Sequence, residues 1–435
     1  MKDGGRLQAA IEVLEALERE HRPATEVLRD WGNAHRFAGS GDRAAIGNLV
    51  HDALRARASL AWRMGSAAPR ALVLATYVRL WGRDIATLEA HLSGDQHAPA
   101  PLEDAERAAL GADEAEGAPD HVRGDYPEWL APSFARVFAD RAVAEGRALS
   151  ARAPVDLRAN TLKSGRNKML AALSRFGAVP TAIAPQGIRL PAGDGPARAP
   201  QVQAEPGYKK GWFEIQDEGS QLAALLAGAR GGDQVADVCA GGGGKTLALS
   251  AAMANKGQIH AFDADRNRLA GIFERLDRAG TRNVQVIPAN ERARLEAMAG
   301  RMDVVLVDAP CTGTGTWRRR PDAKWRLSEK QLADRIADQQ EVLALAEPLV
   351  KPGGRLVYVT CSVLPEENED QVAAFLATHP GYRLQPAAEV WRTALDTALP
   401  DEFRAPVEGH GEAIRLTPAT AGTDGFFVAV MVRAA

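Results

Sequence analysis

The chain has 435 residues, of which 46% are hydrophobic and 25% are charged, and its formal net charge is −3. This length predicts two or three domains, and the ordinary composition excludes a disordered or fibrous protein. The small net charge does not point to a nucleic-acid-binding protein, although acidic segments can hide a local basic patch in such a total.

The cysteine content and the lack of long apolar runs indicate in which cellular compartment the protein is expected. The three cysteines include no Cys-x-x-Cys pair, so a disulfide framework and a structural zinc site are not expected, and no metal is predicted. No apolar run is long enough for a bilayer span, and the start Met-Lys-Asp-Gly-Gly lacks the layout of a signal peptide. We therefore expect a cytoplasmic protein with reduced thiols and no membrane partner.

The first part of the chain is predicted to be helical. Leu7, Ile11 and Leu14 recur at helical spacing, which predicts a small all-α domain over residues 1–93. An acidic stretch rich in Ala and Pro follows over residues 94–125 and predicts a solvated linker with some helical content.

Two further parts follow this linker. Residues 126–215 contain a helical pattern and then short strand-like runs, which predict linker helices and a small α/β module. Residues 216–435 alternate regularly between apolar β-branched runs and helical patterns, which predicts a parallel sheet with helices on both faces. The predicted strands are Val235–Cys239, Gln258–Phe262, Val284–Ile287, Val304–Val307, Arg355–Thr360 and Phe426–Val432.

A glycine loop follows the first of these strands. It reads Cys239-Ala240-Gly241-Gly242-Gly243-Gly244-Lys245-Thr246 and opens a helical segment. Glycines let the backbone approach a ligand and direct amide hydrogens at it, so a nucleoside-type ligand is expected. A phosphate-binding P-loop is the alternative, but the position that this motif needs as Gly is Cys239.

An acidic residue ends the next strand. Asp263 follows Gly244 by 19 positions, and dinucleotide-type folds place a ribose-binding carboxylate about 20 residues past the glycines. The same carboxylate could instead cap the following helix. The glycine loop before it favours the ribose interpretation.

Two cysteines follow the ends of two other predicted strands. Asp308-Ala309-Pro310-Cys311 follows one strand, and Thr360-Cys361 ends the other. The carboxyl ends of parallel strands meet at one sheet edge, where ligands bind, so two thiols there suggest nucleophilic chemistry. A free cysteine is often only a small buried hydrophobe, which is the alternative for each of them. Pro365-Glu366-Glu367 predicts a helix start after Cys361, and a nearby helix amino terminus favours the thiolate.

A basic segment lies just beyond the first of these cysteines. It contains Arg318, Arg319, Arg320 and Lys324 together with two tryptophans. Arginines neutralise phosphates and aromatic rings stack on bases, so this segment predicts contact with nucleic acid. A solvated basic face is the alternative.

Together these motifs resemble those of the cytosine-carbon-5 RNA methyltransferases of the Sun/RsmB and NSUN type. The resemblance covers roughly residues 126–435, and the two cysteine motifs are its most specific part. It also includes the segments Pro127–Leu130, Leu157–Lys163, Gln216–Ser220 and Asp424–Phe427. Asp42–Ile46 and the helix after it resemble the NusB-like RNA-binding domain of the RsmB branch.

The resemblance implies a fold and a cofactor. The fold is the α/β class I methyltransferase, Rossmann-like, with a seven-stranded, mostly parallel sheet whose last strand is antiparallel. The cofactor is S-adenosyl-L-methionine. The residues that the resemblance implies for its binding are Cys239, Ala240, Gly241, Gly242, Gly243, Gly244, Lys245, Asp263, Arg268, Asn290 and Asp308.

The resemblance also implies an activity. The enzyme is expected to methylate carbon 5 of a cytosine in RNA, most closely small-subunit ribosomal RNA, through a covalent adduct with Cys361. Cys311 assists product release, Asp308 binds the polar edge of the base, and Lys245 supports Asp308 or the base. The expected RNA-binding residues are Arg158, Asn160, Lys163, Arg318, Arg319, Arg320 and Lys324.

Two positions depart from the family pattern, and one other function stays open. Gly241 and Gly242 replace the usual Ala-Pro pair, and Asn290 stands where relatives often carry Asp. The alternative function is a non-catalytic RNA-binding or ribosome assembly factor on the same scaffold. Such a protein would have no need for two thiols.

Overall fold

A computed structural model describes residues 1–112 and 117–435, so part of the predicted acidic linker lies outside the described residues. The described chain divides into two compact units. The helical unit comprises Met1–Ala153, Ala192–Ala199 and Trp317–Leu327, and the sheet unit comprises Pro154–Pro191, Pro200–Thr316 and Ser328–Ala435.

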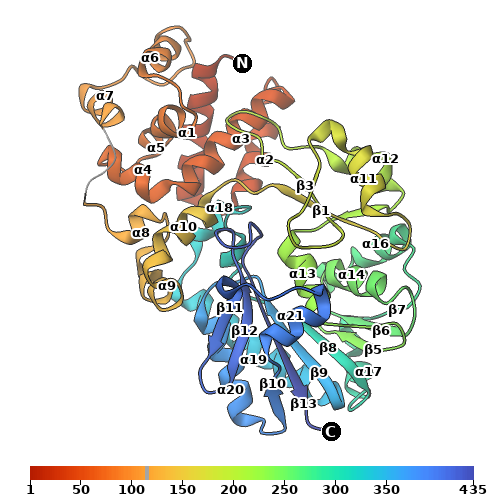
Figure 1. Cartoon of the computed structure of the whole chain (residues 1–435). Helices are drawn as coiled ribbons and strands as arrows, with labels where there is room; N and C mark the ends of the chain where they lie inside the picture. The colour runs from red at the N-terminus through yellow and green to blue at the C-terminus, as the bar shows by residue number, and fades with distance from the viewer. Residues whose placement is uncertain (113–116) are drawn as a thin grey trace. The chain divides into compact units, whose positions relative to one another are not determined.

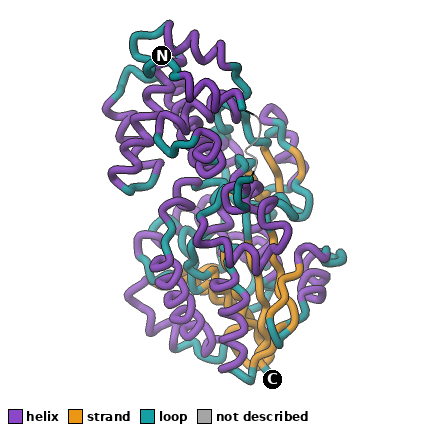
Figure 2. Tube along the Cα trace, turned by 90° about the vertical axis from the view of Figure 1, so that its left-hand side faces the viewer, coloured by secondary structure: helices purple, strands orange, loops and turns teal. Residues whose placement is uncertain are grey.

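The described residues of the helical unit form helices, turns and loops (Figure 2). The helical spacing predicted from the first residues is present, because Leu7, Ile11 and Leu14 of α1 are buried in one apolar core with Leu49 and Leu72. The helices are α1 Asp3–Glu20, α2 Ala24–Ala34, α3 Ser40–Arg55, α4 Arg57–Met64, α5 Pro69–Ala75, α6 Ile85–Ser93, α7 Asp104–Gly111, α8 Asp120–Arg123, α9 Ala131–Phe138, α10 Ala142–Ser150 and α18 Pro321–Arg326.

The units do not follow the predicted boundaries. The described helices of residues 94–153 belong to the helical unit, where Leu110 of the predicted linker is buried in the core. Residues 317–327 also belong to this unit, although the residues on both sides of them in sequence belong to the sheet unit. The basic segment is therefore part of the helical unit.

The sheet unit contains a small and a large sheet (Figure 1). The small one is antiparallel, in the order β2-β3-β1-β4, and packs around Leu157, Ile188 and Phe213. Its strands are β1 Val155–Ala159, β2 Val179–Pro180, β3 Gly187–Leu190 and β4 Phe213–Ile215, with helices α11 Arg166–Ala172 and α12 Pro206–Lys209.

The large sheet has nine strands where the resemblance implied seven. Five strands, β7-β6-β5-β8-β9, are parallel, and β13 is antiparallel to β9 as predicted. The other three strands lie beyond β13, where β11 and β12 form a hairpin and β10 pairs with the end of β13. The strands are β5 Gln234–Asp237, β6 Gln258–Phe262, β7 Val284–Ile287, β8 Met302–Asp308, β9 Val350–Thr360, β10 Tyr382–Leu384, β11 Arg404–Val407, β12 Gly411–Leu416 and β13 Phe426–Arg433.

Helices cover both faces of the large sheet, because its central strands are apolar on both sides. One core contains alternate strand residues with side chains from α17, α19 and α20, and the other contains the intervening residues with side chains from α13, α14 and α21. The helices of this unit are α13 Glu218–Leu226, α14 Gly244–Ala252, α15 Arg266–Leu269, α16 Ile272–Ala279, α17 Arg292–Glu296, α19 Glu329–Ala346, α20 Glu369–Thr378 and α21 Ala387–Leu395.

Strand register fixes where the motifs meet. Asp237 of β5 pairs with Leu306 of β8, and Asp308 of β8 pairs with Val359 of β9. The glycine loop, the Pro-Cys segment and the Thr-Cys segment therefore all leave the sheet at the same edge. Among the described helices, none has the length and apolar composition needed to cross a bilayer.

Candidate active site

The two predicted cysteines lie in contact. The Sγ atoms of Cys311 and Cys361 are 3.4 Å apart, and both residues are partly exposed. Backbone hydrogen bonds join their segments, since the Ala309 N–H donates to the Val359 carbonyl and the Gly315 N–H to the Cys361 carbonyl. The two cysteines are therefore close in space, although 50 positions apart in sequence, because they follow neighbouring parallel strands.

The Cys311 thiol is held in its neutral form. Its hydrogen bond with Cys361, its burial and the neighbouring negative charge raise the pKa of Cys311 well above the ordinary value for a cysteine. Cys361 follows Thr360, whose hydroxyl donates to Asn368 at 2.5 Å, so the Thr-Cys turn is fixed on its other side.

Lys245 and Asp308 form an ion pair at the same edge. The Lys245 Nζ lies 2.7 Å from Asp308 Oδ2, and the lysine side chain is buried while the aspartate is partly exposed. The ammonium also lies 5.1 Å from the centre of the Phe426 ring. An exposed carboxylate oxygen supported by a buried cation is suited to accept hydrogen bonds from a polar base edge.

The glycine loop is built around two unusual backbone conformations. Gly241 and Gly243 have φ values of 49° and 81°, a region that favours glycine. At Gly243 an added Cβ would lie 2.6 Å from Ile272 of α16, so a larger residue would collide there. The loop leads into α14, whose amino-terminal end carries unpaired N–H groups suited to a polar ligand.

Asp263 supports this loop directly. Its Oδ2 accepts from the Gly241 N–H at 2.8 Å, and its Oδ1 accepts from the Asp265 N–H at 2.9 Å. Arg268 approaches the same carboxylate at 3.9 Å from the exposed side. The structure therefore brings Asp263 and Arg268 to the predicted cofactor loop, and Asn290 is exposed in the short turn after β7.

Asp237 is a feature of the loop that the sequence analysis did not single out. It is fully buried at the end of β5, and its Oδ2 accepts from the Thr246 hydroxyl at 2.7 Å. Burial raises its pKa to about 7, and its Oδ1 has no protein hydrogen-bond partner among the described residues. Cys239, two residues further along, is also buried, and burial raises the pKa of its thiol.

A buried carboxylate next to the cysteines was also missed. Glu367 is fully buried, and its Oε1 accepts from the Thr312 N–H at 2.8 Å and from Gln339 at 3.0 Å. Its Oε2 accepts from the Thr312 hydroxyl at 2.5 Å. The predicted helix start is a 3₁₀ turn, Pro365–Glu367, and this turn delivers the carboxylate to the Cys311 segment.

The structure corrects two predicted RNA contacts in the small sheet. The Arg158 side chain is buried and donates to Gln216 at 2.7 Å, and buried Asn160 donates to two backbone carbonyls at 2.8 Å. Both are structural residues, because neither has surface to offer a phosphate. Lys163 is exposed, although its ammonium also contacts the Arg278 carbonyl at 2.6 Å.

The basic segment requires a similar correction. Lys324 is fully buried and donates to the Arg55 carbonyl at 2.9 Å and to the Ser150 hydroxyl at 2.7 Å. Burial lowers its pKa to about 7. Arg318 is buried as well, whereas Arg319 and Arg320 are exposed. Of the four residues predicted to contact RNA here, Arg319 and Arg320 keep the exposure that this contact requires.

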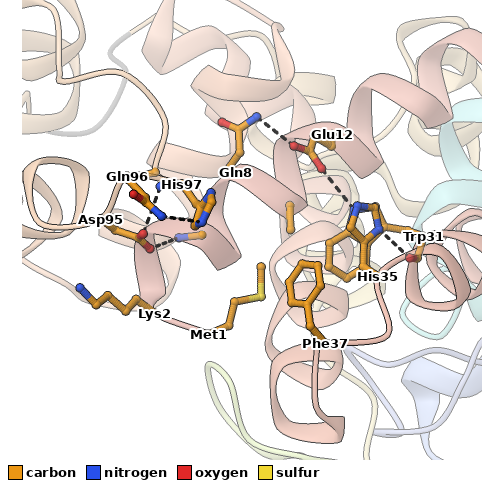
Figure 3. A pocket seen from close by; sticks show the side chains of 13 residues that line it. Met1, Lys2, Gln8, Glu12, Trp31, His35, Phe37, Asp95, Gln96 and His97 are labelled. Carbon is orange, nitrogen blue, oxygen red and sulfur yellow. Dashed lines mark hydrogen bonds between the residues drawn. The ribbon is translucent and has the colours of Figure 1, made fainter.

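A cavity of about 920 Å³ opens on the helical unit (Figure 3). On one side of it the Trp31 and His35 rings stack at 4.3 Å, and the Phe37 ring meets His35 edge-on at 5.7 Å. The Trp31 indole N–H donates to Glu12 at 3.3 Å. Phe37 is 72% exposed, which is unusual for so large an apolar side chain.

The sequence model of the family "16S rRNA methyltransferase RsmB/F" matches residues 224–432. Ribosomal RNA small subunit methyltransferase B from Sodalis glossinidius is 32% identical over 77% of this chain and 69% of its own length. The chain belongs to this family. The corresponding protein from Enterobacter sp. (strain 638) is 33% identical, and the match spans 71% of this chain and 66% of that relative.

Solved structures agree with the family assignment. PH0851 superposes with a TM-score of 0.72 over 98% of both chains at 24% identity, which shows that the fold is shared. A methyltransferase homologue from Pyrococcus horikoshii gives a TM-score of 0.58 at 28% identity, over 72% of this chain and 97% of that one. These findings confirm the predicted family, the methyltransferase fold, an RNA methyltransferase activity and S-adenosyl-L-methionine as cofactor.

The residues of the glycine loop fit this cofactor. The loop offers a close backbone approach at Gly241 and Gly243, a supported carboxylate at Asp263, and an unpaired buried oxygen on Asp237. Among the described residues, no group of three or more His, Cys, Asp or Glu side chains could hold a metal ion.

Proposed function

We propose that this RsmB/F-family methyltransferase modifies carbon 5 of a cytosine in small-subunit ribosomal RNA, through a covalent adduct between Cys361 and the base. The contact between the Cys311 and Cys361 thiols at 3.4 Å, next to the Lys245–Asp308 pair in the sheet edge, carries this proposal. Methylation at an oxygen or an exocyclic nitrogen needs no such pair of thiols.

The chemistry requires both sulfur atoms. The Cys361 thiolate adds to carbon 6 of the ring, and the electrons of the 5,6 double bond make carbon 5 nucleophilic. Bound S-adenosyl-L-methionine supplies an electrophilic methyl group. Cys311 then takes the proton from carbon 5, directly or through water, the double bond re-forms, and the carbon–sulfur bond breaks to return the electron pair to Cys361.

The ion pair is assigned to recognition of the base. The partly exposed Asp308 carboxylate accepts hydrogen bonds from the polar edge of cytosine, and buried Lys245 holds that carboxylate in place. The target base has to be unstacked, because a thiol must reach carbon 6 from the face of the ring.

The helical unit is assigned to RNA binding. Its cavity exposes Phe37 beside the stacked Trp31 and His35 rings, which is a surface on which an unpaired base can stack. Exposed Arg319 and Arg320 offer cations to phosphates.

Methyl transfer from labelled cofactor to purified small-subunit RNA tests the proposal. Bisulfite mapping should locate the product at a cytosine, and Cys361→Ala should abolish it. If the protein binds the RNA without transferring a methyl group, it is instead a non-catalytic assembly factor. Transfer that persists in Cys361→Ala would exclude the covalent route.

A further inference from the structure

Two thiols in contact raise a question that the cysteine motifs alone do not answer. Cys311 and Cys361 are both partly exposed and only 3.4 Å apart, so a thiolate on one disfavours a thiolate on the other. The proposed reaction requires Cys361 to be the one that ionises first. A neighbouring group therefore has to make Cys361 easier to ionise than Cys311.

Glu367 is placed to do so. Its carboxylate accepts the N–H and the hydroxyl of Thr312, the residue directly after Cys311. Gln339 of α19 donates both to this carboxylate and to the carbonyl of Pro310, the residue directly before Cys311. The carboxylate is therefore attached on both sides to the segment that carries Cys311.

The hydrogen-bond pattern indicates the charge of this group. Thr312 and Gln339 donate to the Glu367 oxygens, and a carboxylate that accepts several such bonds is favoured over the acid. Burial acts in the opposite direction and raises the pKa of Glu367 above its ordinary value. The donated hydrogen bonds act against burial and favour the ionised carboxylate.

Two other side chains at this edge, Tyr358 and Lys245, do not offset this charge. Tyr358 of β9 donates its hydroxyl to the Glu367 backbone carbonyl at 2.7 Å, and burial raises the pKa of this phenol, so it remains neutral. The cation at this edge, Lys245, is committed to Asp308. Cys361 and Glu367 therefore raise the pKa of Cys311, whereas the hydrogen bond from the Gly313 backbone lowers it.

We propose that Glu367 is a positioning residue that keeps Cys311 protonated in the free enzyme and thereby assigns the thiolate to Cys361. When Cys361 becomes a thioether with the base, its hydrogen bond and its charge no longer act on Cys311. Cys311 then loses its proton to solvent water and, as a thiolate, accepts the proton from carbon 5. The assignment of the two roles rests on the proposed function, whereas the ionisation order is a property of the free protein.

Alkylation of the native protein tests the order directly. Trypsin places the two thiols on separate peptides, Met302–Arg318 and Leu356–Arg383, so mass spectrometry can follow each with iodoacetamide across a range of pH. Cys361 should react about tenfold faster than Cys311 at neutral pH, and Cys311 should gain reactivity only in alkaline solution. Faster alkylation of Cys311 in the wild-type chain would overturn the proposal without any variant.

A variant that removes the charge of Glu367 tests the role of this residue. Glu367→Gln should move the alkylation profile of Cys311 to lower pH by about one unit and lower kcat while leaving the KM for RNA unchanged. Glu367→Asp, which keeps the charge, should restore the wild-type profile, and Glu329→Gln, an exposed change on α19, should have no effect. An unchanged Cys311 profile in folded Glu367→Gln would refute the role.

The effect of the partner thiol can be measured separately. Cys361→Ala mimics the loss of its hydrogen bond, so the Cys311 profile should again move to lower pH. These measurements need no RNA. If they succeed while no methylated cytosine is found, the proposed function fails and the ionisation order stands.

Discussion

The ammonium of Lys245 lies 2.7 Å from the carboxylate of Asp308, which ties the first turn of α14 to the end of β8. The glycine loop precedes this lysine and the Pro-Cys segment follows this aspartate, so the pair joins the cofactor loop to the cysteines. Its integrity is the first test of the proposed site.

Lys245→Met keeps the length of the side chain but removes its charge. We expect kcat to fall by about 10²-fold or more, because the carboxylate that holds the base loses its buried cation. Single-turnover methylation with saturating RNA measures this. Lys256→Met, at an exposed lysine of the same unit, is the control and should retain full activity.

Cys311→Ala should let the enzyme attack the base but not release it. The group that takes the carbon-5 proton is lost, whereas Cys361 can still add to carbon 6. A protein–RNA complex that survives denaturing electrophoresis is the expected readout, and it should disappear in the double variant with Cys361→Ala. Normal turnover with no trapped complex would contradict the role of Cys311.

RNA binding should depend on salt concentration in part through Arg319 and Arg320, the exposed arginines of the basic segment. Replacing both by Ala should weaken binding and reduce the slope of log K against log salt by about 0.7 for each lost phosphate contact. Filter binding at several salt concentrations gives the slope. Lys324→Met should leave it unchanged, because Lys324 is buried; a flatter slope in that variant would contradict the structure.

The burial of Lys324 predicts that the free energy of unfolding depends on pH. Burial lowers its pKa from 10.5 to about 7, so above that pH the unfolded chain binds a proton that the folded chain has lost. This contribution to the unfolding free energy therefore rises with pH from about 7 towards 10.5, by up to about 1.4 kcal/mol per pH unit. Lys324→Met removes this titrating group. Thermal unfolding of both proteins at pH 6 and pH 9 should show that the stability of the variant relative to the wild-type protein is greater at pH 6.

Phe37 is the test of the helical unit. Phe37→Ala should reduce RNA affinity by about 1–3 kcal/mol if a base stacks on the ring, with little change in thermal stability because the side chain is exposed. Trp62→Ala, at another exposed aromatic of this unit that lies outside the cavity lining, is the matched control. Equal losses in both variants would argue against a specific stacking site.

The sequence by itself indicated the family and the sheet that presents the candidate residues. The parallel strands were predictable because β-branched runs alternate with helical patterns, and Cys311, Cys361, Asp308 and Lys245 were predictable because short polar motifs follow those runs. Strand ends converge at one edge of a parallel sheet, so residues far apart in sequence could be assigned to one site.

The tertiary structure decided which polar side chains are free to act. The sequence presents Arg158, Asn160 and Lys324 as available cations and donors, but packing buries them against backbone carbonyls and neighbouring side chains. It presents Glu367 only as part of a helix start, but the 3₁₀ turn delivers that carboxylate to the Cys311 segment. Burial and hydrogen-bond partners come from contacts between distant segments, which residue type and spacing do not encode.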